Sequence, residues 1–340
     1  MSVKKHEVFV LSTEGQPLTP TTWRKAKQLL KAGVAKKTWS KFGTFGIQML
    51  VATRHETPLT SLGIDDGTKY NGYAVVCGNE NVLAVKWDMP DKQLIGRKLE
   101  ERRTLRRARR SRHCRRRPAR FRNRRRQGFI APSQLVIVNS RMKALRELYC
   151  LYPISRVGFE DVRFNHAKRR WGANFSTVEI GKTRIKNWLS ERSQVFEYEG
   201  WETEDLREKY GYRKTSVKSA DKFTAHCSDA LALAVDVGIG QQVDEGRFIV
   251  VDDSYRCVRR KLHDTQFAKG GIREDYSRGT VFGLRKGLLV GTPKRTGQLC
   301  GKMNRAYRYY DWERKRHSSK KLSWVSAQFK MKEVGNPPAA

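Results

Sequence analysis

The strongest constraint on this chain is an arginine run between Arg97 and Arg126, where sixteen of the thirty residues are arginine. Lys98 adds another positive charge and only Glu100 and Glu101 oppose it, so the local net charge is +15. Like charges one helical turn apart repel, and an isolated helix of this sequence would be destabilised in water. Guanidinium groups bind phosphate oxygens in pairs. The run therefore predicts a basic helix that lies along a nucleic acid.

The overall charge favours the same kind of partner. The 340 residues include 70 Lys and Arg against 34 Asp and Glu, a net charge of +36, and phosphate backbones are the usual ligand of so basic a protein. No run approaches the ~20 apolar residues that cross a bilayer, so we expect no membrane partner. The 6 cysteines are far apart in the sequence, which argues against a zinc ribbon or a disulfide framework and favours the reducing cytoplasm.

Hydrophobic periodicity predicts an α/β chain. We expect strands at 8–11, 45–51, 62–66, 72–77, 81–87, 154–162 and 195–198. We expect helices at 22–30, 91–117, 133–152, 178–192 and 223–235. From about Arg247, glycines and alternating apolar residues favour a small twisted β-barrel. Residues 256–333 again carry a net charge of +15.

Two carboxylates belong to apolar strands. Asp65 follows Leu62-Gly-Ile, and strand alternation lets only one of Asp65 and Asp66 face a given side. Because Asp65 continues the apolar strand, we favour it as the site residue. Glu160 lies within the next apolar strand after the basic helix, and its neighbour Asp161 points the other way. The alternatives are an ordinary Asp-Gly turn for Asp65 and an edge-strand residue facing water for Glu160.

The third candidate group is His226 and Asp229, whose i, i+3 spacing puts both on one helix face. Alanines at 225, 230 and 232 would let that helix approach a sheet. The alternatives are a satisfied core histidine and a solvent-facing aspartate. Phosphodiester cleavage by two metal ions needs several carboxylates at one point, and Mg²⁺ prefers oxygen ligands. The sequence has no Walker loop, His-Glu-x-x-His or Gly-x-Ser-x-Gly motif that would indicate another chemistry.

This order of residues resembles the split RuvC nuclease domain, an RNase H-like fold. The arginine run falls where a bridge helix interrupts that domain in RNA-guided nucleases. The N-terminal residues are similar to the PLMP domain of transposon-encoded IscB-family proteins, with Pro17-Leu18-Thr19-Pro20 carrying Thr where the family has Met. The family's Gly-Ile-Asp-Pro-Gly occurs as Gly63-Ile-Asp-Asp-Gly67.

One departure narrows the resemblance. IscB proteins carry an HNH nuclease between the RuvC glutamate and the His-x-x-Asp helix. Here only 65 residues separate Glu160 from His226, with one histidine, His166, and no cysteine. The Cys-x-x-Cys zinc finger of the related TnpB nucleases is also missing. The chain therefore resembles IsrB, the HNH-lacking relatives of IscB.

The resemblance implies a domain order. It predicts an α/β chain with an RNase H-like RuvC domain split by an arginine-rich bridge helix, a small N-terminal α+β PLMP domain and a C-terminal basic β-barrel-like domain. The expected ranges are 1–55 for PLMP, 56–90 for the first RuvC segment, 91–127 for the bridge helix, 128–245 for the remaining RuvC segments, 246–335 for the domain that interacts with the target-adjacent motif, and 336–340 for a disordered tail.

The resemblance also implies an activity, an RNA-guided DNA nickase. A large noncoding guide RNA and a double-stranded DNA target with an adjacent motif would be its partners, and the protein would act as a monomer within a ribonucleoprotein in the prokaryotic cytoplasm, at the nucleoid. Asp65, Glu160 and Asp229 would hold two Mg²⁺ ions, for which Mn²⁺ could substitute, and His226 would orient or deprotonate water. The residues expected to bind phosphates are Arg102, Arg103, Arg106, Arg107, Arg109, Arg110, Arg112, Arg115 and Arg116.

Two other function classes stay open. A structural RNA-binding protein explains the arginine run and the basic C-terminal region equally well, but it offers no reason for the carboxylates. An unguided RuvC-type junction resolvase explains the carboxylates but does not need the arginine run. Metal-dependent cleavage separates an enzyme from a binding protein, and co-purifying RNA separates the RNA-binding protein from the resolvase.

Overall fold

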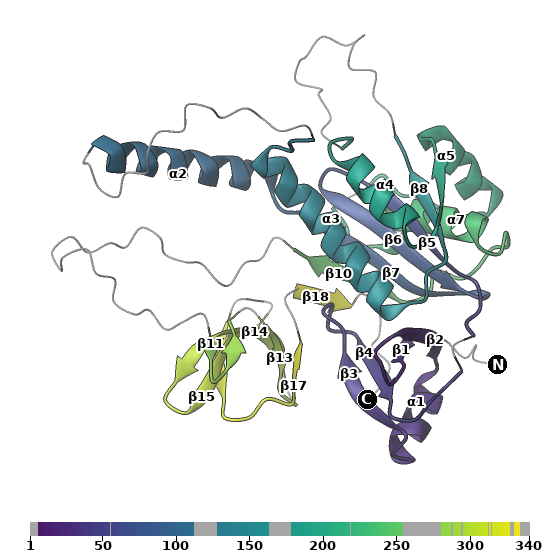
Figure 1. Ribbon diagram of the computed structural model, residues 1–340, viewed down its shortest axis with the longest axis horizontal. Coiled ribbons are helices and arrows are strands. Elements are labelled where there is room, and N and C mark those ends of the chain that lie inside the picture. The colour runs from purple at the N-terminus through teal and green to yellow at the C-terminus, as the bar shows by residue number, and fades with distance from the viewer. Residues whose placement is uncertain are drawn as a thin grey trace, which may run out of the picture.

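The computed structural model describes residues 6–54, 56–111, 128–162, 178–217 and 219–253, and in the C-terminal part residues 280–286, 288–293, 295–311, 313, 315–326 and 330–333. These residues form a mixed α/β protein with several sheets (Figure 1). None of the helices in the described ranges is long and apolar enough to cross a membrane. The expected disordered tail at 336–340 lies outside the described residues.

The N-terminal unit is a four-stranded sheet with one helix packed on it. Its strands, in their order across the sheet, are β2 (Pro17–Thr21), β1 (Val8–Leu11), β4 (Phe45–Met49) and β3 (Ala35–Trp39). Helix α1 (Trp23–Lys31) begins at the expected position. The Lys25 amide donates a hydrogen bond of 3.3 Å to Thr22 Oγ1, which caps the helix.

A seven-stranded sheet forms the centre of the protein. In order across the sheet its strands are β18 (Lys330–Glu333), β10 (Phe248–Asp252), β7 (Glu80–Asp88), β6 (Tyr70–Cys77), β5 (Thr60–Asp66), β8 (Arg156–Glu160) and β9 (Gln194–Tyr198). Strands β5, β6 and β7 form an antiparallel meander, and β8 and β9 continue the sheet parallel to β5. Parallel pairing puts the carboxyl ends of β5 and β8 at the same edge of the sheet.

Helices cover both faces of this sheet (Figure 1). On one face are α3 (Pro132–Leu151) and α4 (Lys182–Ser190), and on the other α5 (Gly200–Lys209), α6 (Phe223–His226) and α7 (Ser228–Val237). Side-chain alternation divides the core in two: Val75 of β6 packs in the cluster that contains Leu145 of α3, whereas Ala74 packs in the cluster that contains Leu231 of α7.

Helix α7 lies unusually close to the sheet. A Cβ atom built on Gly63 of β5 would overlap the carbonyl oxygen of Ala230 in α7, and one built on Gly72 of β6 would overlap that of His226, the last residue of α6. The helix contacts β5, β6 and β8. Because no side chain stands between helix and strands at these glycines, the first turn of α7 is brought against the edge where β5 and β8 end.

The basic helix α2 spans Lys92–Ser111 and extends away from the central sheet (Figure 1). Ile95 in its first turn packs against the central core. Arg102, Arg103, Arg106 and Arg107 are exposed. Arg109 and Arg110 belong to the same helix, whereas Arg112, Arg115, Arg116 and the end of the helix expected at 91–117 lie outside the described residues.

The C-terminal part contains a second, five-stranded antiparallel sheet and a small hairpin of β11 (Thr280–Val281) and β12 (Leu284–Arg285). In order across the sheet, its strands are β16 (Arg316–Ser319), β15 (Ala306–Tyr310), β14 (Thr296–Met303), β13 (Leu289–Gly291) and β17 (Trp324–Ser326).

The structure differs from the expected boundary at residue 246. Strands β10 and β18 fall in the range expected for the C-terminal domain, but both belong to the central sheet, where β10 pairs in parallel with β7. The run Phe248–Val251 is buried throughout. Consecutive apolar residues give a strand two apolar faces, which suits a sheet covered by helices on both sides.

We predict that Gly63→Ala destabilises the protein by about 1–3 kcal/mol, the usual effect of overpacking a core, because its methyl group must push α7 off β5. Urea unfolding of the purified chain measures this change. Gly96→Ala in α2 is the matched control, since a Cβ there meets open space. Equal stability of both variants would show that α7 does not need the close approach.

Candidate active site

Three of the four sequence-predicted site residues come together at the carboxyl edge of β5 and β8. Asp65 is the penultimate residue of β5, Glu160 is the last residue of β8, and Asp229 lies in the first turn of α7. Asp65 and Glu160 share a side-chain hydrogen bond, and Asp229 is close enough to act electrostatically on both. The sheet register and the close approach of α7 produce this convergence.

The cluster is electrostatically unfavourable by itself. Burial raises the pKa of Asp65 well above its ordinary value, and the negative charges of Glu160 and Asp229 raise it further. Burial also raises the pKa of Glu160, although the hydrogen bond from Asp65 acts in the opposite direction. Both side chains keep some exposure to solvent. A divalent cation would remove this repulsion, and three carboxylates are a donor set that suits Mg²⁺.

Two basic residues already neutralise part of the cluster. Arg207 Nη1 lies 2.9 Å from Asp229 Oδ1, and Lys214 Nζ contacts Asp229 Oδ2. Both oxygens of Asp229 are therefore engaged by positive charge. Among the described residues, no three His, Cys, Asp or Glu side chains are arranged to hold a metal ion as they stand. The orientation of Asp229 toward its two basic partners is consistent with that result.

His226 is placed differently from the expectation of one continuous helix. The helix is interrupted at Cys227, whose φ of −125° and ψ of −5° separate α6 from α7. The buried ring of His226 packs edge-on against Tyr70, with 5.0 Å between the ring centroids. Its Nε2 is 3.1 Å from the carbonyl oxygen of Ala220. Because a carbonyl only accepts, Nε2 carries the proton and Nδ1 is the basic nitrogen of the neutral ring.

The neighbouring aspartates point to the other face of the sheet, as strand alternation predicts. Asp66 is buried with Arg141 of α3, whose Nη1 lies 3.4 Å from its Oδ2. Asp161 pairs with Lys182 at 3.3 Å and Lys186 at 3.1 Å, both on α4. These two carboxylates have structural partners that tie helices to the sheet.

Sequence reasoning missed Arg207 and Lys214. They lie 22 and 15 residues before Asp229, a distance at which no helical or strand periodicity connects side chains. Only a general physical argument could have predicted such partners. A buried carboxylate without a bound ion needs a cationic partner, and this chain is rich in lysine and arginine.

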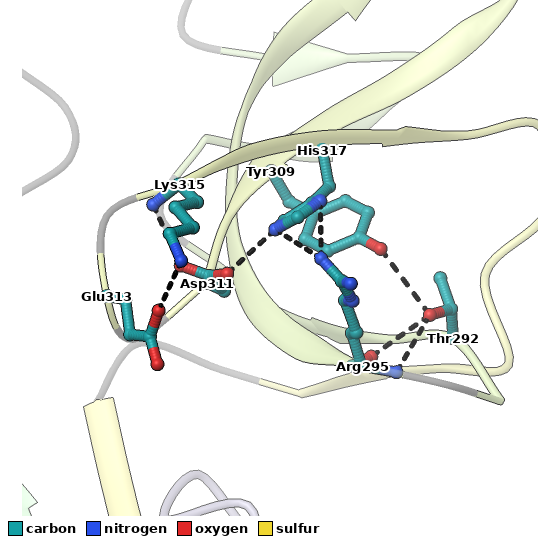
Figure 2. Close-up of polar contacts among 7 residues, drawn as sticks. All are labelled: Thr292, Arg295, Tyr309, Asp311, Glu313, Lys315 and His317. Carbon is teal, nitrogen blue, oxygen red and sulfur yellow. Dashed lines mark hydrogen bonds and ion pairs between the residues drawn. The ribbon is translucent and has the colours of Figure 1, made fainter.

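A second candidate site is a cavity of about 630 Å³ in the five-stranded C-terminal sheet. Its lining combines two arginines, a histidine and several hydroxyl groups: Thr292, Pro293, Arg295, Tyr309, Arg316, His317, Ser318 and Ser319. Figure 2 shows Arg295 against His317, with Nη1 2.9 Å from Nδ1 of the ring, and His317 Nε2 2.7 Å from Asp311 Oδ2. The His317 hydrogen bond lowers the pKa of Asp311. Such a lining suits an anionic group such as phosphate.

We predict that Asp65→Asn raises the melting temperature of the metal-free protein at pH 7 by about 2–4 °C, the shift that ~1 kcal/mol produces. Since the folded-state pKa of Asp65 is raised, its ionisation opposes folding. The penalty is absent below the ordinary carboxyl pKa and grows as pH rises through the raised value. The stabilisation should therefore disappear near about pH 4.

Thermal unfolding in a chelator across this pH range measures the effect. Asp205→Asn on the exposed side of α5 is the control and should change nothing. A lower melting temperature for Asp65→Asn at neutral pH would mean that the cluster does not oppose folding.

Comparison with known proteins identifies a family to which the sequence is similar. No curated protein matches the chain, but the sequence pattern of the family described as "RRXRR protein" matches residues 8–182. The arrangement Arg-Arg-x-Arg-Arg itself occurs at residues 106–110, in α2. The matched region is the arginine-rich domain typical of IscB- and IsrB-like proteins. Since the match covers just over half of its residues, the chain belongs to the RRXRR protein family.

Proposed function

We propose that the protein is an RNA-guided DNA nickase of the IsrB type, with a RuvC-type active site at Asp65, Glu160, His226 and Asp229. The observation that carries this proposal is the convergence of three carboxylates from β5, β8 and α7. They come from parts of the chain as far apart as residues 65 and 229. A structural RNA-binding protein gives no reason to assemble such a cluster against its own electrostatic repulsion.

The topology supports a nuclease domain split by the basic helix. Strands β5, β6 and β7 precede α2, and β8 follows it, yet β5 and β8 are direct neighbours in one sheet. The arginine-rich segment is thus inserted between two parts of a single domain. The RRXRR match is compatible with membership of a RuvC-like nuclease family.

In the proposed mechanism, Asp65, Glu160 and Asp229 would hold the metal ion, and His226 would accept a proton from water. When bound, Mg²⁺ would supply Lewis acidity at the site. Because Nε2 of His226 is held by the Ala220 carbonyl, Nδ1 is the nitrogen that would accept a proton from water. The close approach of α7 keeps Asp229 aligned with the two strand carboxylates.

Nucleic-acid binding is assigned to the basic surfaces. The exposed arginines of α2 would bind phosphates of the guide RNA and the target strand, while base pairing supplies the sequence specificity. The basic C-terminal region would contact the DNA next to the target. Within it, the cavity beside Arg295 and Arg316 is a candidate phosphate-binding site.

The test of the nickase uses the full chain co-expressed with RNA from its own locus. A supercoiled plasmid carries a guide-matched target beside randomised flanks, and Mg²⁺ is added. We expect relaxed circles that require the guide match. Asp65→Ala should abolish nicking and leave RNA and DNA binding intact, whereas Asp205→Ala, an exposed change on α5, should nick normally.

Other outcomes separate the alternatives. Relaxed circles without any guide requirement would favour an unguided nuclease. Tight RNA binding without cleavage would favour the structural RNA-binding protein. Linear product would indicate a second cutting activity, and full nicking by Asp65→Ala would remove Asp65 from the active site.

For the C-terminal cavity, we predict that Arg295→Ala weakens DNA binding by about three- to tenfold at physiological salt and lowers the salt slope by about 1, as loss of one phosphate contact does. Binding isotherms at several salt concentrations measure both values. Lys315→Ala is the matched control, because this exposed lysine pairs with Glu313 outside the cavity (Figure 2). Equal losses in both variants would indicate a general charge effect.

A further inference from the structure

Lys214 is the basic residue that all three carboxylates of the cluster share. Its ammonium group contacts Asp229 Oδ2. Its charge also acts on the two strand carboxylates, where it lowers a pKa that burial raises in Asp65 and in Glu160. The ammonium is therefore close enough to act on all three carboxylates, as a bound cation would.

The backbone on both sides of Lys214 is fixed to the helices that form the site. The Ser228 hydroxyl donates a hydrogen bond of 2.7 Å to the carbonyl oxygen of Arg213, and the Thr215 amide donates one of 3.0 Å to the carbonyl oxygen of Thr224. The residues before and after Lys214 are thus tied to α7 and α6. These two hydrogen bonds hold the backbone of Lys214 where its side chain reaches Asp229.

The two basic partners of Asp229 differ in how easily each side chain could move away from the carboxylate. The Arg207 side chain is 12% exposed and also pairs with Glu204, whereas the Lys214 side chain is 40% exposed. Asp229 itself is 6% exposed. Arg207 is therefore the fixed partner of the buried carboxylate. Lys214 has a flexible stem with a path to solvent, so it is the partner that can move away.

We propose that Lys214 is a displaceable counter-ion of the carboxylate cluster, which occupies Asp229 in the absence of metal and leaves it when Mg²⁺ binds. This inference rests on the proposed metal site. A divalent ion and an ammonium group repel each other at contact distances, and they compete for the same carboxylate oxygen. The lysine relieves the repulsion among the carboxylates in the metal-free protein, and it also weakens metal binding. Only an ion that binds several carboxylates at once displaces it.

The test measures metal affinity directly, without nucleic acid or cleavage. The full chain, freed of RNA at high salt, is titrated with Mn²⁺ while electron paramagnetic resonance counts the free ion, and Mg²⁺ is then added as competitor. We expect Lys214→Met to bind the ion about tenfold more tightly, the effect of removing a competing charged hydrogen bond. Lys214→Gln, which keeps a donor without the charge, should gain less. Lys209→Met is the control, because Lys209 pairs with Asp236 away from the cluster.

Thermal unfolding of the same variants gives a second readout that would also reveal a folding defect. Without metal, Lys214→Met should melt below the unaltered protein, and saturating Mg²⁺ should raise its melting temperature more than it raises that of the unaltered protein. Unchanged or weaker metal binding by Lys214→Met would overturn the role of Lys214 and leave the metal site intact. If neither the unaltered chain nor any variant binds the ion, and Asp65→Asn gives the same titration curve as the unaltered chain, both the inference and the metal site are overturned.

Discussion

The contact between α7 and the central sheet is the constraint on which the candidate site depends. Gly63 on β5 lets the backbone of α7 approach the strand, and Gly72 on β6 does the same for the end of α6, at points where a Cβ would overlap a carbonyl oxygen. That approach aligns the first turn of α7 with the ends of β5 and β8. Asp229 thereby joins two strand carboxylates that parallel pairing had already placed at one edge. A larger residue at Gly63 would act on the site through the position of the helix.

Electrostatics then explains the surroundings of the site. A buried carboxylate group in a strongly basic chain attracts cationic partners, and Arg207 and Lys214 supply them at Asp229. The same chain leaves the arginines of α2 on an exposed helix that extends from the body. Two opposite electrostatic environments thus coexist. The compact negative cluster attracts a cation, and the extended positive surface attracts phosphate. The proposed nuclease activity would use both, the cluster for the metal ion and the basic surface for the nucleic-acid backbone.

The sequence predicted those elements whose apolar pattern was strong. The strands of the meander, helix α3 and the strand that carries Glu160 lie where periodicity indicated. Strand β2 was missed because its two prolines disfavour a strand, and it is tolerated at the edge of its sheet. Helix α5 was missed because it is almost wholly polar. Its N-terminus is set by a capping box between Glu199 and Glu202 rather than by an apolar face.

The candidate carboxylates could be selected from the sequence because each belongs to an element with a clear apolar face. Their basic partners could not, because Lys214 reaches Asp229 through a loop whose path depends on tertiary hydrogen bonds. The break at Cys227 was equally invisible, since its neighbours on both sides favour a helix. Spacing alone put His226 and Asp229 on one face, whereas the structure gives the histidine its own backbone partner.

The pairing of β10 with β18 has a consequence for how the C-terminal sheet is connected. That sheet is an insertion whose two ends both return to adjacent strands of the central sheet. The chain therefore leaves the central sheet after β10 and rejoins it at β18, so that two neighbouring strands at one edge of that sheet bracket the whole C-terminal sheet in sequence.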